Sequence, residues 1–480
     1  MKIAKAGYKE NIKLKETIKR NTDMDRKENF GRHTRLDYVI IGNSAAGVAA
    51  AESIRRIDNK SKISIFTVEK YSNYSKPLIT YFLSGKLDLE KTYFKDSGFY
   101  EKNDIDLRLG TRVISIDPSG QSLVTDKNET VTFTRLLIAC GGKPAIPGVK
   151  VIDKTGNAQT LKDTIDRISG IFTLTTLDDA IRLKKYIGEN KIKSASILGG
   201  GLIGLKAAEA FLELGIKINI VEFAGQILSA SFDKTASEII TSCIEETKSS
   251  VLTNSTIDEI YTDGSGRIFE YKLKNGKKLS CNLLVVAVGV FPDVSILEGC
   301  ADKIMADNGI VVDQFMKTTA DNIYAAGDII KSFDMLTEES RNIAIWPLAV
   351  RQGNIAGKNM AGARAKYKGG FFMNSVEILG IPVISMGLSN TDDNEIEGIE
   401  TFKIYNLQKR IYRRIVIRKN KVIGAILAGS IERAGIYAGL ISNEIDISDI
   451  KDNIAKEDFG IIQLPEGYRK HLVVGDGIEV

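Results

Sequence analysis

Two stretches of the chain repeat the same order of apolar and polar positions. In the first, an apolar strand pattern at Leu36–Ile41 is followed by an alanine-rich helical pattern at Val48–Arg56 and a second strand pattern at Ile63–Val68. The corresponding segments of the second are Ser194–Leu198, Leu205–Leu214 and Ile216–Val221. A strand, a helix and a parallel strand in this order form one βαβ unit. The pattern therefore predicts an α/β protein with two Rossmann-like units, each able to bind a dinucleotide.

Each first strand leads directly into a glycine-rich turn, Gly42-Asn-Ser-Ala-Ala-Gly47 in one copy and Gly199-Gly-Gly-Leu-Ile-Gly204 in the other. Such a turn allows backbone N–H groups and the helix N-terminus to meet a pyrophosphate. The acid that ends the following strand, Glu69 or Glu222, should accept hydrogen bonds from ribose hydroxyls. One such turn would be weak evidence, and Ser44 replaces the second glycine of the first copy. Two complete copies favour nucleotide binding over a mere turn.

Glu222 also bears on the choice of cofactor. A carboxylate at this position would repel a 2′-phosphate, and the next residues, from Phe223 to Gln226, include no arginine that could bind one. The sequence therefore favours NADH over NADPH.

The pattern changes in two other parts of the chain. Residues 145–170 are rich in polar residues and glycine, which predicts a connection at 151–170. From about residue 366, strand-like segments predict a separate α+β domain over 366–480. These segments are Lys403–Tyr405, Ile411–Arg418 and Val422–Ala428.

Composition and charge narrow the class of protein. The 480 residues predict two to three domains, and 43% hydrophobic residues are enough for a sizeable core. No apolar stretch of about 18 residues is long enough for a transmembrane helix, and no signal peptide is expected. The chain has a net charge of +5, and residues 1–35, with eleven Lys/Arg against five Asp/Glu, contribute a net of +6, so the remainder is close to neutral at −1. We expect this segment to be a solvated extension, in preference to a nucleic-acid-binding arm.

The cysteines exclude some chemistry. Cys140, Cys243, Cys281 and Cys300 form no CxxC pair, and the chain has only two histidines. Local zinc and iron–sulfur motifs are therefore excluded, and no metal site is predicted. Sparse, unpaired cysteines are typical of a reducing cytoplasm.

From about Asp37 to its end, the chain resembles the pyridine nucleotide–disulfide oxidoreductase superfamily, and within it rubredoxin reductases, the FAD domains of nitrite reductases and flavoproteins that accompany anaerobic carbon monoxide dehydrogenases. The most specific segment is Thr318–Asp328, whose final Asp lies at the flavin ribityl chain and pyrophosphate in such proteins. Further matching segments are Tyr74–Ile79, Thr134–Gly142, Gly201–Glu209, Leu284–Asp293, Trp346–Gly353, Val422–Gly429 and Glu457–Gly460.

The resemblance implies that FAD-binding segments 36–150 and 291–362 flank an NAD-binding domain at 171–290. It also implies that the C-terminal α+β part is an interface domain, which is common in homodimers. The candidate cofactor-binding residues for FAD and NAD(H) are Gly42, Ser44, Ala45, Ala46, Gly47, Glu69, Lys76, Pro77, Val113, Ala139, Cys140, Gly141, Gly199, Gly201, Leu202, Ile203, Gly204, Glu222, Gly289, Gly327, Asp328 and Trp346.

The chemistry expected of the site depends on a missing sulfur. Disulfide reductases of the superfamily carry a redox cysteine after the first βαβ unit, where this chain reads Tyr71-Ser-Asn-Tyr-Ser-Lys-Pro-Leu78. A thiolate relay needs a nucleophilic sulfur there. Disulfide reduction is therefore disfavoured, and Cys140 is expected to be an inert residue in contact with FAD. No residue is assigned an acid–base or nucleophilic catalytic role.

Three further residues have competing interpretations. Lys76 stands beside Pro77 where relatives carry Arg-Pro near the flavin, and it either stabilises negative charge on reduced flavin or is a surface lysine. Lys206 stands where many relatives carry Glu, and Tyr81 where some carry the Lys that pairs with it, so a different local charge arrangement is expected. Trp346 and Pro347 should open a helix that points at the flavin, although core packing explains Trp346 equally well. His471 is interpreted as structural.

The leading hypothesis is a cytoplasmic NADH:acceptor oxidoreductase that passes electrons from FAD to a small carrier, such as rubredoxin, ferredoxin or an iron–sulfur subunit. The alternatives are a peroxide-forming NADH oxidase, a membrane-surface NADH:quinone reductase and a non-catalytic FAD-binding subunit of a larger complex. The quinone reductase predicts a C-terminal amphipathic helix, for which Ile461–Val480 is poor material because it contains Pro465 and several glycines.

Overall fold

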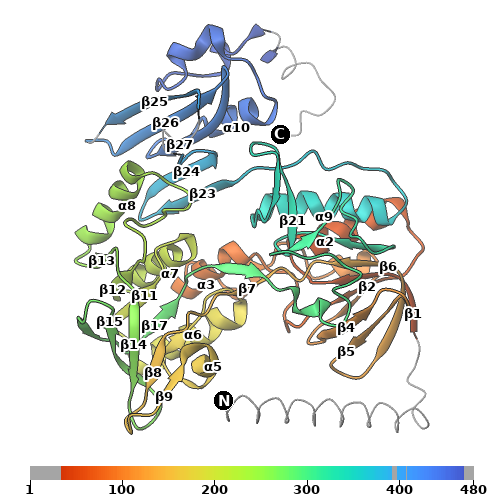
Figure 1. Cartoon of the computed structure of the whole chain (residues 1–480), viewed down its shortest axis with the longest axis horizontal. Coiled ribbons are helices and arrows are strands. Elements are labelled where there is room, and N and C mark those ends of the chain that lie inside the picture. The colour runs from red at the N-terminus through yellow and green to blue at the C-terminus, as the bar shows by residue number, and fades with distance from the viewer. Residues whose placement is uncertain (1–33, 392–396, 407, 467, 470–480) are drawn as a thin grey trace, which may run out of the picture.

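A computed structural model describes residues 34–391, 397–406, 408–466 and 468–469 (Figure 1). The basic segment at the N-terminus and His471 lie outside these residues. The predicted first unit is present as β1 (Thr34–Ile41), α2 (Ala45–Ile57) and β2 (Ile63–Phe66). The two strands are parallel and belong to a seven-stranded sheet of order β3-β2-β1-β6-β5-β4, with β20 beside β6. The other strands are β3 (Ile105–Arg108), β4 (Val113–Asp117), β5 (Ser122–Thr125), β6 (Thr130–Ile138) and β20 (Ile323–Ala325).

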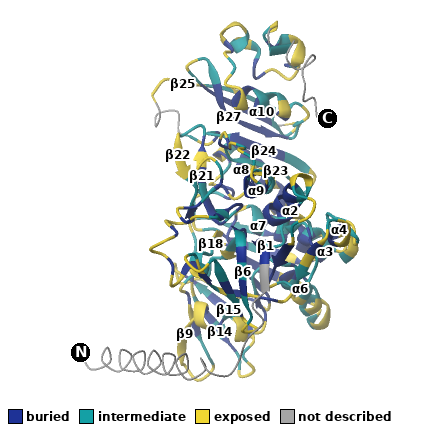
Figure 2. Cartoon of the chain, turned by 90° about the vertical axis from the view of Figure 1, so that its right-hand side faces the viewer, coloured by how far each residue is buried: buried dark blue, intermediate teal, exposed yellow. Residues whose placement is uncertain are grey.

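Helix α2 is rich in alanine because another helix approaches its backbone closely. Its partner is α9 (Trp346–Met360), which begins at Trp346 as predicted. A Cβ atom at Gly353 would overlap the carbonyl oxygen of Ala46, and one at Gly357 would overlap that of Ala50. The facing surfaces of the two helices are buried (Figure 2). Helix α9 therefore packs a segment from far along the chain against the first βαβ unit.

The second unit is β11 (Ser194–Leu198), α7 (Leu202–Glu213) and β12 (Lys217–Val221). Helix α7 begins at Leu202 and not at Leu205, because the end of the glycine turn already forms its first helical turn. A five-stranded parallel sheet contains this unit in the order β10-β17-β11-β12-β13. Its other elements are β10 (Ile171–Phe172), β13 (Ser250–Leu252), β17 (Leu284–Val286), α6 (Leu177–Asn190) and α8 (Lys234–Glu246).

Residues 151–170, expected to be a plain connection, carry structure of their own. Strand β8 (Lys150–Ile152) pairs in parallel with β14 (Ile257–Thr262), and β9 (Ala158–Thr160) pairs with β8. With β15 (Ile268–Leu273) and β16 (Lys278–Ser280) they form one sheet. Leu161, in the one-turn helix α5 (Leu161–Thr164), is fully buried under this sheet. Strands this short give no readable pattern in the sequence.

The C-terminal part is an antiparallel sheet with one covering helix, as predicted. Its strand order is β23-β24-β27-β26-β25. One set of its side chains forms a core of its own with α10, and another set joins the core of the second βαβ unit. The bounds are β23 (Met373–Ile378), β24 (Ile381–Gly387), β25 (Ile399–Asn406), β26 (Ile411–Arg418), β27 (Lys421–Ala428) and α10 (Ala434–Ser442).

The C-terminal sheet packs on the second nucleotide-binding unit through helix α8. Asp233 caps α8 by accepting a hydrogen bond from Ala236 N at 3.1 Å. The same carboxylate accepts from the Tyr412 hydroxyl and, at 3.4 Å, from Arg414 Nη1, and both of these residues lie on β26. The buried Asp233 carboxylate thus caps the N-terminus of α8 and binds the C-terminal sheet to the second βαβ unit.

Shorter elements connect the two βαβ units and the C-terminal sheet. Strands β7 (Gly142–Pro144) and β18 (Val290–Pro292) pair where the chain crosses between the two nucleotide-binding units. Further elements are helix α3 (Ile79–Ser84) and the strands β21 (Ile330–Asp334) and β22 (Glu339–Arg341). No helix in the described part of the chain is long and apolar enough to cross a lipid bilayer.

Lys206 lies where all three domains meet. Its ammonium group pairs with Glu209 on the same helix and donates to the carbonyl oxygen of Glu377, on β23, at 3.2 Å. It also lies 4.6 Å from the centre of the Tyr81 ring, on α3. Glu209 in turn accepts from Leu379 N at 3.0 Å. The two residues expected from the sequence to have changed together, Lys206 and Tyr81, are therefore in contact, and the lysine is bound to a carboxylate of its own helix.

We predict that Lys206→Met destabilises the protein by about 3 kcal/mol, because it leaves the nearly buried Glu209 without its cation. The exposed pair Lys234–Glu238 supplies a matched control, since both side chains are mostly in solvent. Lys234→Met should change stability by less than about 0.5 kcal/mol. Denaturant titration followed by circular dichroism compares the two variants. Equal effects would show that Lys206 is an ordinary surface charge.

Candidate functional site

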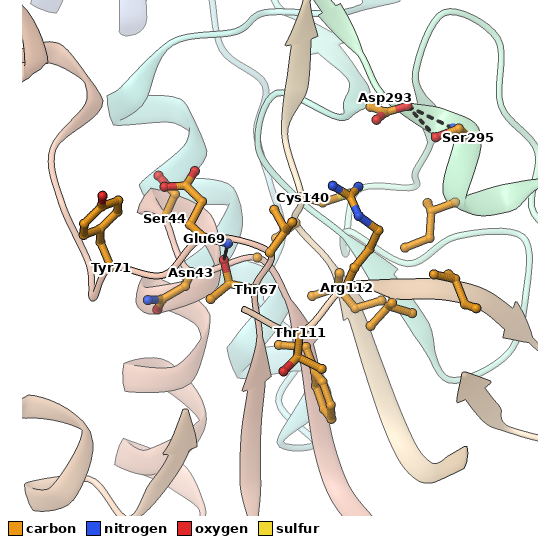
Figure 3. A pocket seen from close by; sticks show the side chains of 18 of the residues that line it. Asn43, Ser44, Thr67, Glu69, Tyr71, Thr111, Arg112, Cys140, Asp293 and Ser295 are labelled. Carbon is orange, nitrogen blue, oxygen red and sulfur yellow. Dashed lines mark hydrogen bonds between the residues drawn. The ribbon is translucent and has the colours of Figure 1, made fainter. Parts of the chain in front are cut away.

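A cavity of about 350 Å³ opens at the carboxyl ends of β1, β2 and β6. This is the edge of a parallel sheet at which α/β proteins bind nucleotides. The turn after β1 forms one wall, and the loop before β4 and the segment after β18 form others. In Figure 3, Asn43, Ser44 and Glu69 lie on one side of the cavity, Asp293 and Ser295 lie on the other, and the Arg112 side chain reaches between them.

The first glycine turn has a conformation that other residues cannot adopt. Gly42 has a φ of +113°, and a Cβ there would overlap the carbonyl oxygen of Ala139. A Cβ at Gly47 would overlap the carbonyl oxygen of Gly42. Ser44, the residue that departs from the usual motif, has ordinary extended backbone and makes no side-chain cap to α2. The first N–H groups of α2 therefore remain open to an anion.

Asn43 leaves a polar atom in the cavity wall without a partner. Its Oδ1 accepts a hydrogen bond from the Tyr100 hydroxyl at 2.7 Å. Its Nδ2 is buried and donates to no described residue. An unpaired buried donor costs about 1–3 kcal/mol. The residues present therefore fit a ligand rich in acceptor oxygens, such as a pyrophosphate.

Glu69, Lys76 and Asp328 are three of the charged residues at or near the cavity. Lys76 Nζ is 3.9 Å from Glu69 Oε1, and both residues line the wall. Burial raises the pKa of Asp328, while the positive charge of Lys76 opposes this shift. No hydrogen bond from a described residue reaches the Asp328 carboxylate. A largely buried acid without donors fits a ligand that supplies hydroxyl groups.

Asp328 is placed by the contact between α2 and α9. Gly327 N donates to Gln352 Oε1 of α9 at 3.0 Å. A Cβ at Gly327 would lie 3.1 Å from the Cβ of Ala46, on α2. Trp346, at the start of α9, packs edge-on against Phe94 at 5.3 Å between ring centres. Trp346 therefore packs against an aromatic neighbour, which is one of the two roles that the sequence suggested for it.

Cys140 faces the cavity and is accessible there, although protein atoms surround its sulfur closely. Burial of the thiol, with a smaller contribution from the charge of Asp293, raises its pKa from 9.0 to about 12. The thiol therefore stays protonated at neutral pH. Cys243, Cys281 and Cys300 are buried and do not line the cavity. The described residues contain no group of three His, Cys, Asp or Glu side chains that could hold a metal ion.

The second glycine turn repeats the geometry of the first. Gly199 has a φ of +109°, and a Cβ there would overlap the Ala287 carbonyl oxygen, as one at Gly204 would overlap that of Gly199. Glu222 accepts from Gly200 N at 2.6 Å and from Ala224 N at 2.7 Å. The carboxylate is thus held against the turn before any nucleotide binds.

The structure brings together some of the residues predicted from the sequence. Gly42, Ser44, Glu69, Lys76, Val113, Ala139 and Cys140 line the cavity. Ala45, Ala46 and Gly47 follow within α2. Pro77, Gly141, Gly289, Gly327, Asp328 and Trp346 lie outside its lining, and Gly199, Gly201, Leu202, Ile203, Gly204 and Glu222 form the second site.

The sequence interpretation missed Asn43, Thr67, Thr111, Arg112, Asp293 and Ser295, which also line the cavity. Thr111 and Arg112 follow β3, a parallel strand next to β2. The rule that ligands lie at the carboxyl ends of such strands could have identified them, had β3 been recognised.

Residues 36–353 match the family model described as pyridine nucleotide-disulphide oxidoreductase. The chain belongs to this family. Residues 373–445 match a second model, the C-terminal domain of rubredoxin NAD⁺ reductase. The protein is accordingly an enzyme, an NAD(P)H-dependent flavin oxidoreductase that binds FAD and NAD(P)H. The two glycine turns described above are consistent with two dinucleotides.

Curated relatives include subunit epsilon of the NADH-dependent phenylglyoxylate dehydrogenase of Aromatoleum evansii, 28% identical over 89% of this chain and 96% of that subunit. The nitrite reductase [NAD(P)H] of Bacillus subtilis is 29% identical over 86% of this chain, which spans only 48% of that enzyme. The NADH:rubredoxin oxidoreductase structure from Clostridium acetobutylicum has a TM-score of 0.68 and 22% identity, and covers 88% of this chain and 99% of its own. This last likeness shows the fold alone.

Substitution of a turn glycine should remove FAD without a general loss of structure. Gly47→Ala places a methyl group against the Gly42 carbonyl oxygen, and we expect the purified protein to lose most of its flavin and about 1–3 kcal/mol of stability. Gly188→Ala is the control, because Gly188 lies in helix α6 with open space around it. The ratio of flavin to protein absorbance measures the result. Full flavin content in Gly47→Ala would contradict the assigned turn.

The thiol of Cys140 should be inert. The raised pKa of Cys140 lowers the fraction of its thiolate at pH 8. We therefore expect slow alkylation of Cys140 by iodoacetamide in the flavin-free protein, followed by mass spectrometry, with free cysteine as the reference. Cys140→Ala should retain NADH-dependent flavin reduction. Its loss with FAD still bound would reveal a redox role for the sulfur.

Proposed function

We propose that this protein is an NADH:acceptor oxidoreductase that passes electrons from bound FAD to a small electron-carrier protein without a redox-active disulfide. The observation that carries the proposal is the sulfur content of the cavity wall. Cys140 is the only cysteine that lines the described cavity, and its pKa is strongly raised. A dithiol relay needs two sulfurs with accessible thiolates. Electrons must then leave by a route other than a disulfide.

We assign the cavity to FAD and the second turn to NADH. For FAD, Gly42–Gly47 and Asn43 would hold the pyrophosphate, Glu69 a ribose, and Asp328 the hydroxyls of the linking chain. For NADH, Gly199–Gly204 and Glu222 would play the corresponding parts. When bound, FAD supplies the hydride and electron-transfer chemistry that no side chain of the site provides. The protein binds and orients both nucleotides, and Lys76 places a positive charge beside the cavity.

The acceptor class has support from likeness to known proteins. The C-terminal part matches the domain of rubredoxin NAD⁺ reductase. Similar folds include a ferredoxin reductase from Rhodopseudomonas palustris (TM-score 0.72, 22% identity) and putidaredoxin reductase in complex with putidaredoxin (TM-score 0.75, 19% identity). We further propose a cytoplasmic homodimer, as the family resemblance implies. The second candidate is the flavin subunit of a larger complex, since one relative of nearly equal length is named as a subunit.

Anaerobic titration of the purified protein tests the proposal. NADH should bleach the flavin absorbance, and rubredoxin or ferredoxin should restore it faster than oxygen or a quinone does. A flavin that NADH does not reduce would contradict catalysis and favour the binding subunit. Fast reoxidation by oxygen with release of peroxide would favour an oxidase, and fast reoxidation by quinone alone a quinone reductase.

NADH should reduce the flavin with a KM at least about tenfold below that of NADPH. Glu222→Gln removes the charge that opposes a 2′-phosphate, so we expect the KM for NADH to rise and that for NADPH to fall, with kcat little changed. Glu245→Gln, an exposed change on helix α8, is the control and should leave both KM values unaltered. A wild-type preference for NADPH would refute the assignment of Glu222.

A further inference from the structure

The chain doubles back after helix α9 and runs along it toward β23 (Figure 1). Ala363 N donates to Lys358 O at 3.0 Å near the end of the helix. Farther along, the carbonyl oxygen of Gly369 accepts from Arg351 Nη1 at 3.2 Å, almost two helical turns earlier in α9. Residues 363–370 are therefore antiparallel to α9 and lie on its surface.

Hydrogen bonds fix this segment in an extended form. The Asn359 side chain donates to Ala365 O at 2.8 Å and accepts from Ala365 N at 2.7 Å. Tyr367 N donates to Gln314 O at 2.7 Å, and the Tyr367 side chain is buried. Side chains alternate along extended backbone, so residues two apart share a face about 6.6 Å apart. The outward residues are Arg364, Lys366 and Lys368, and all three are exposed.

Two exposed cations of α9, Arg351 and Lys358, lie beside this row. We call Arg351, Lys358, Arg364, Lys366 and Lys368 the basic ridge. None of them forms an ion pair with a carboxylate in the described part of the chain. This sets the ridge apart from cations such as Lys317 and Lys331, which lie nearby in sequence and have acidic partners at 2.8 Å.

The cationic side chains are ordered by aromatic rings. The Arg364 guanidinium and the Lys366 ammonium lie 5.9 and 6.0 Å from the centre of the Phe315 ring, and Arg351 lies 6.0 Å from that of Tyr367. Phe333, whose side chain is 44% exposed, adjoins the ridge, since a Cβ at Gly369 would lie 2.9 Å from its Cδ1. An exposed aromatic residue within a charged rim is typical of a protein-binding surface.

The segment that carries the ridge ends against the first turn of α9. Gly370 lies against Leu348, in the first turn of α9, because a Cβ there would be 2.6 Å from its Cδ1. Gln352, the neighbour of Arg351, accepts from Gly327 N beside Asp328. In the same turn of α9, Gln352 therefore contacts the segment that contains Asp328, and its neighbour Arg351 belongs to the ridge.

We propose that the basic ridge docks the acidic face of the small electron-carrier protein, an inference that rests on the function proposed above. Five unpaired positive charges raise the local concentration of an acidic partner and speed its association. The aromatic spot at Phe333 supplies apolar contact once the partner has docked. An anionic lipid surface would meet the same charges, but it would not need the exposed aromatic ring of Phe333 beside them.

The test compares two triple charge reversals in the holoenzyme. Arg364→Glu/Lys366→Glu/Lys368→Glu alters the ridge. Lys162→Glu/Lys274→Glu/Lys277→Glu makes the same change in net charge with three exposed lysines that form no ion pair with a described residue, one in α5 and two in the predicted NAD-binding domain. The readouts are flavin reduction by NADH, steady-state reduction of the neutral quinone menadione, and reduction of rubredoxin and of a [2Fe–2S] ferredoxin at several salt concentrations.

The ridge variant should lower kcat/KM for the carriers at least about tenfold at low salt, through KM, and flatten its salt dependence. Flavin reduction and menadione turnover should be unchanged, and the control triple should change carrier turnover less than twofold. Lys366→Gln introduces no negative charge and therefore cannot disturb the fold by charge repulsion. It should also lower kcat/KM for the carriers, but less than the triple variant does.

Equal losses in both triples, or no loss in the ridge variant, would overturn the docking site while leaving the proposed function intact. Wild-type protein whose reduced flavin transfers electrons to neither carrier would instead overturn the proposed acceptor. Co-sedimentation with phosphatidylserine vesicles that the ridge variant loses, with carrier turnover unaffected, would assign the ridge to a membrane surface and overturn the proposal.

Discussion

The contact between the two ends of each glycine turn determines where the rest of the structure can lie. Gly47 presses against the Gly42 carbonyl oxygen, and Gly204 against that of Gly199. Without side chains at these points, the helix can begin directly at the end of the strand, with its free N–H groups directed at the sheet edge. Helix α2, placed in this way, meets α9 through Gly353 and Gly357, and that contact brings Asp328 to the first site from far along the chain. The nucleotide site and the hydrophobic core thus depend on the same close backbone approach.

The two sites differ in how far they are organised by the protein alone. Glu222 is already held by two backbone N–H groups. The first site instead keeps an unpaired donor on Asn43 and a carboxylate on Asp328 without donors. Such groups are costly unless a ligand fills the cavity, so a ligand that pairs with them should stabilise the fold. The proposed assignment of FAD to the first site and of NADH to the second agrees with this difference.

Sequence patterns predicted the long, periodic parts of this fold and missed the short ones. Strand β26 has the predicted limits, Ile411–Arg418, because it is a run of eight residues rich in β-branched and aromatic side chains and has antiparallel partners on both sides. Strands β8 and β9 are too short to show a period, and their partner β14 lies far away in sequence. Glu222 could be predicted as a candidate because it follows a motif at a fixed spacing, and the structure places its carboxylate against the glycine turn. Arg112 was not, since only the pairing of β3 with β2 brings it to the cavity.

The basic ridge shows why some functional surfaces are not readable in one dimension. Arg364, Lys366 and Lys368 alternate in the sequence, and that alternation alone indicates a solvated strand. Their significance comes from the return of the chain along α9, which adds Arg351 and Lys358 to the same face. Cys140 is the only cysteine among the described residues that line the cavity, and the proposed function therefore sends the electrons to a partner outside the chain. An unpaired positive face beside the helix that positions Asp328 is where an acidic acceptor would approach with the least electrostatic cost.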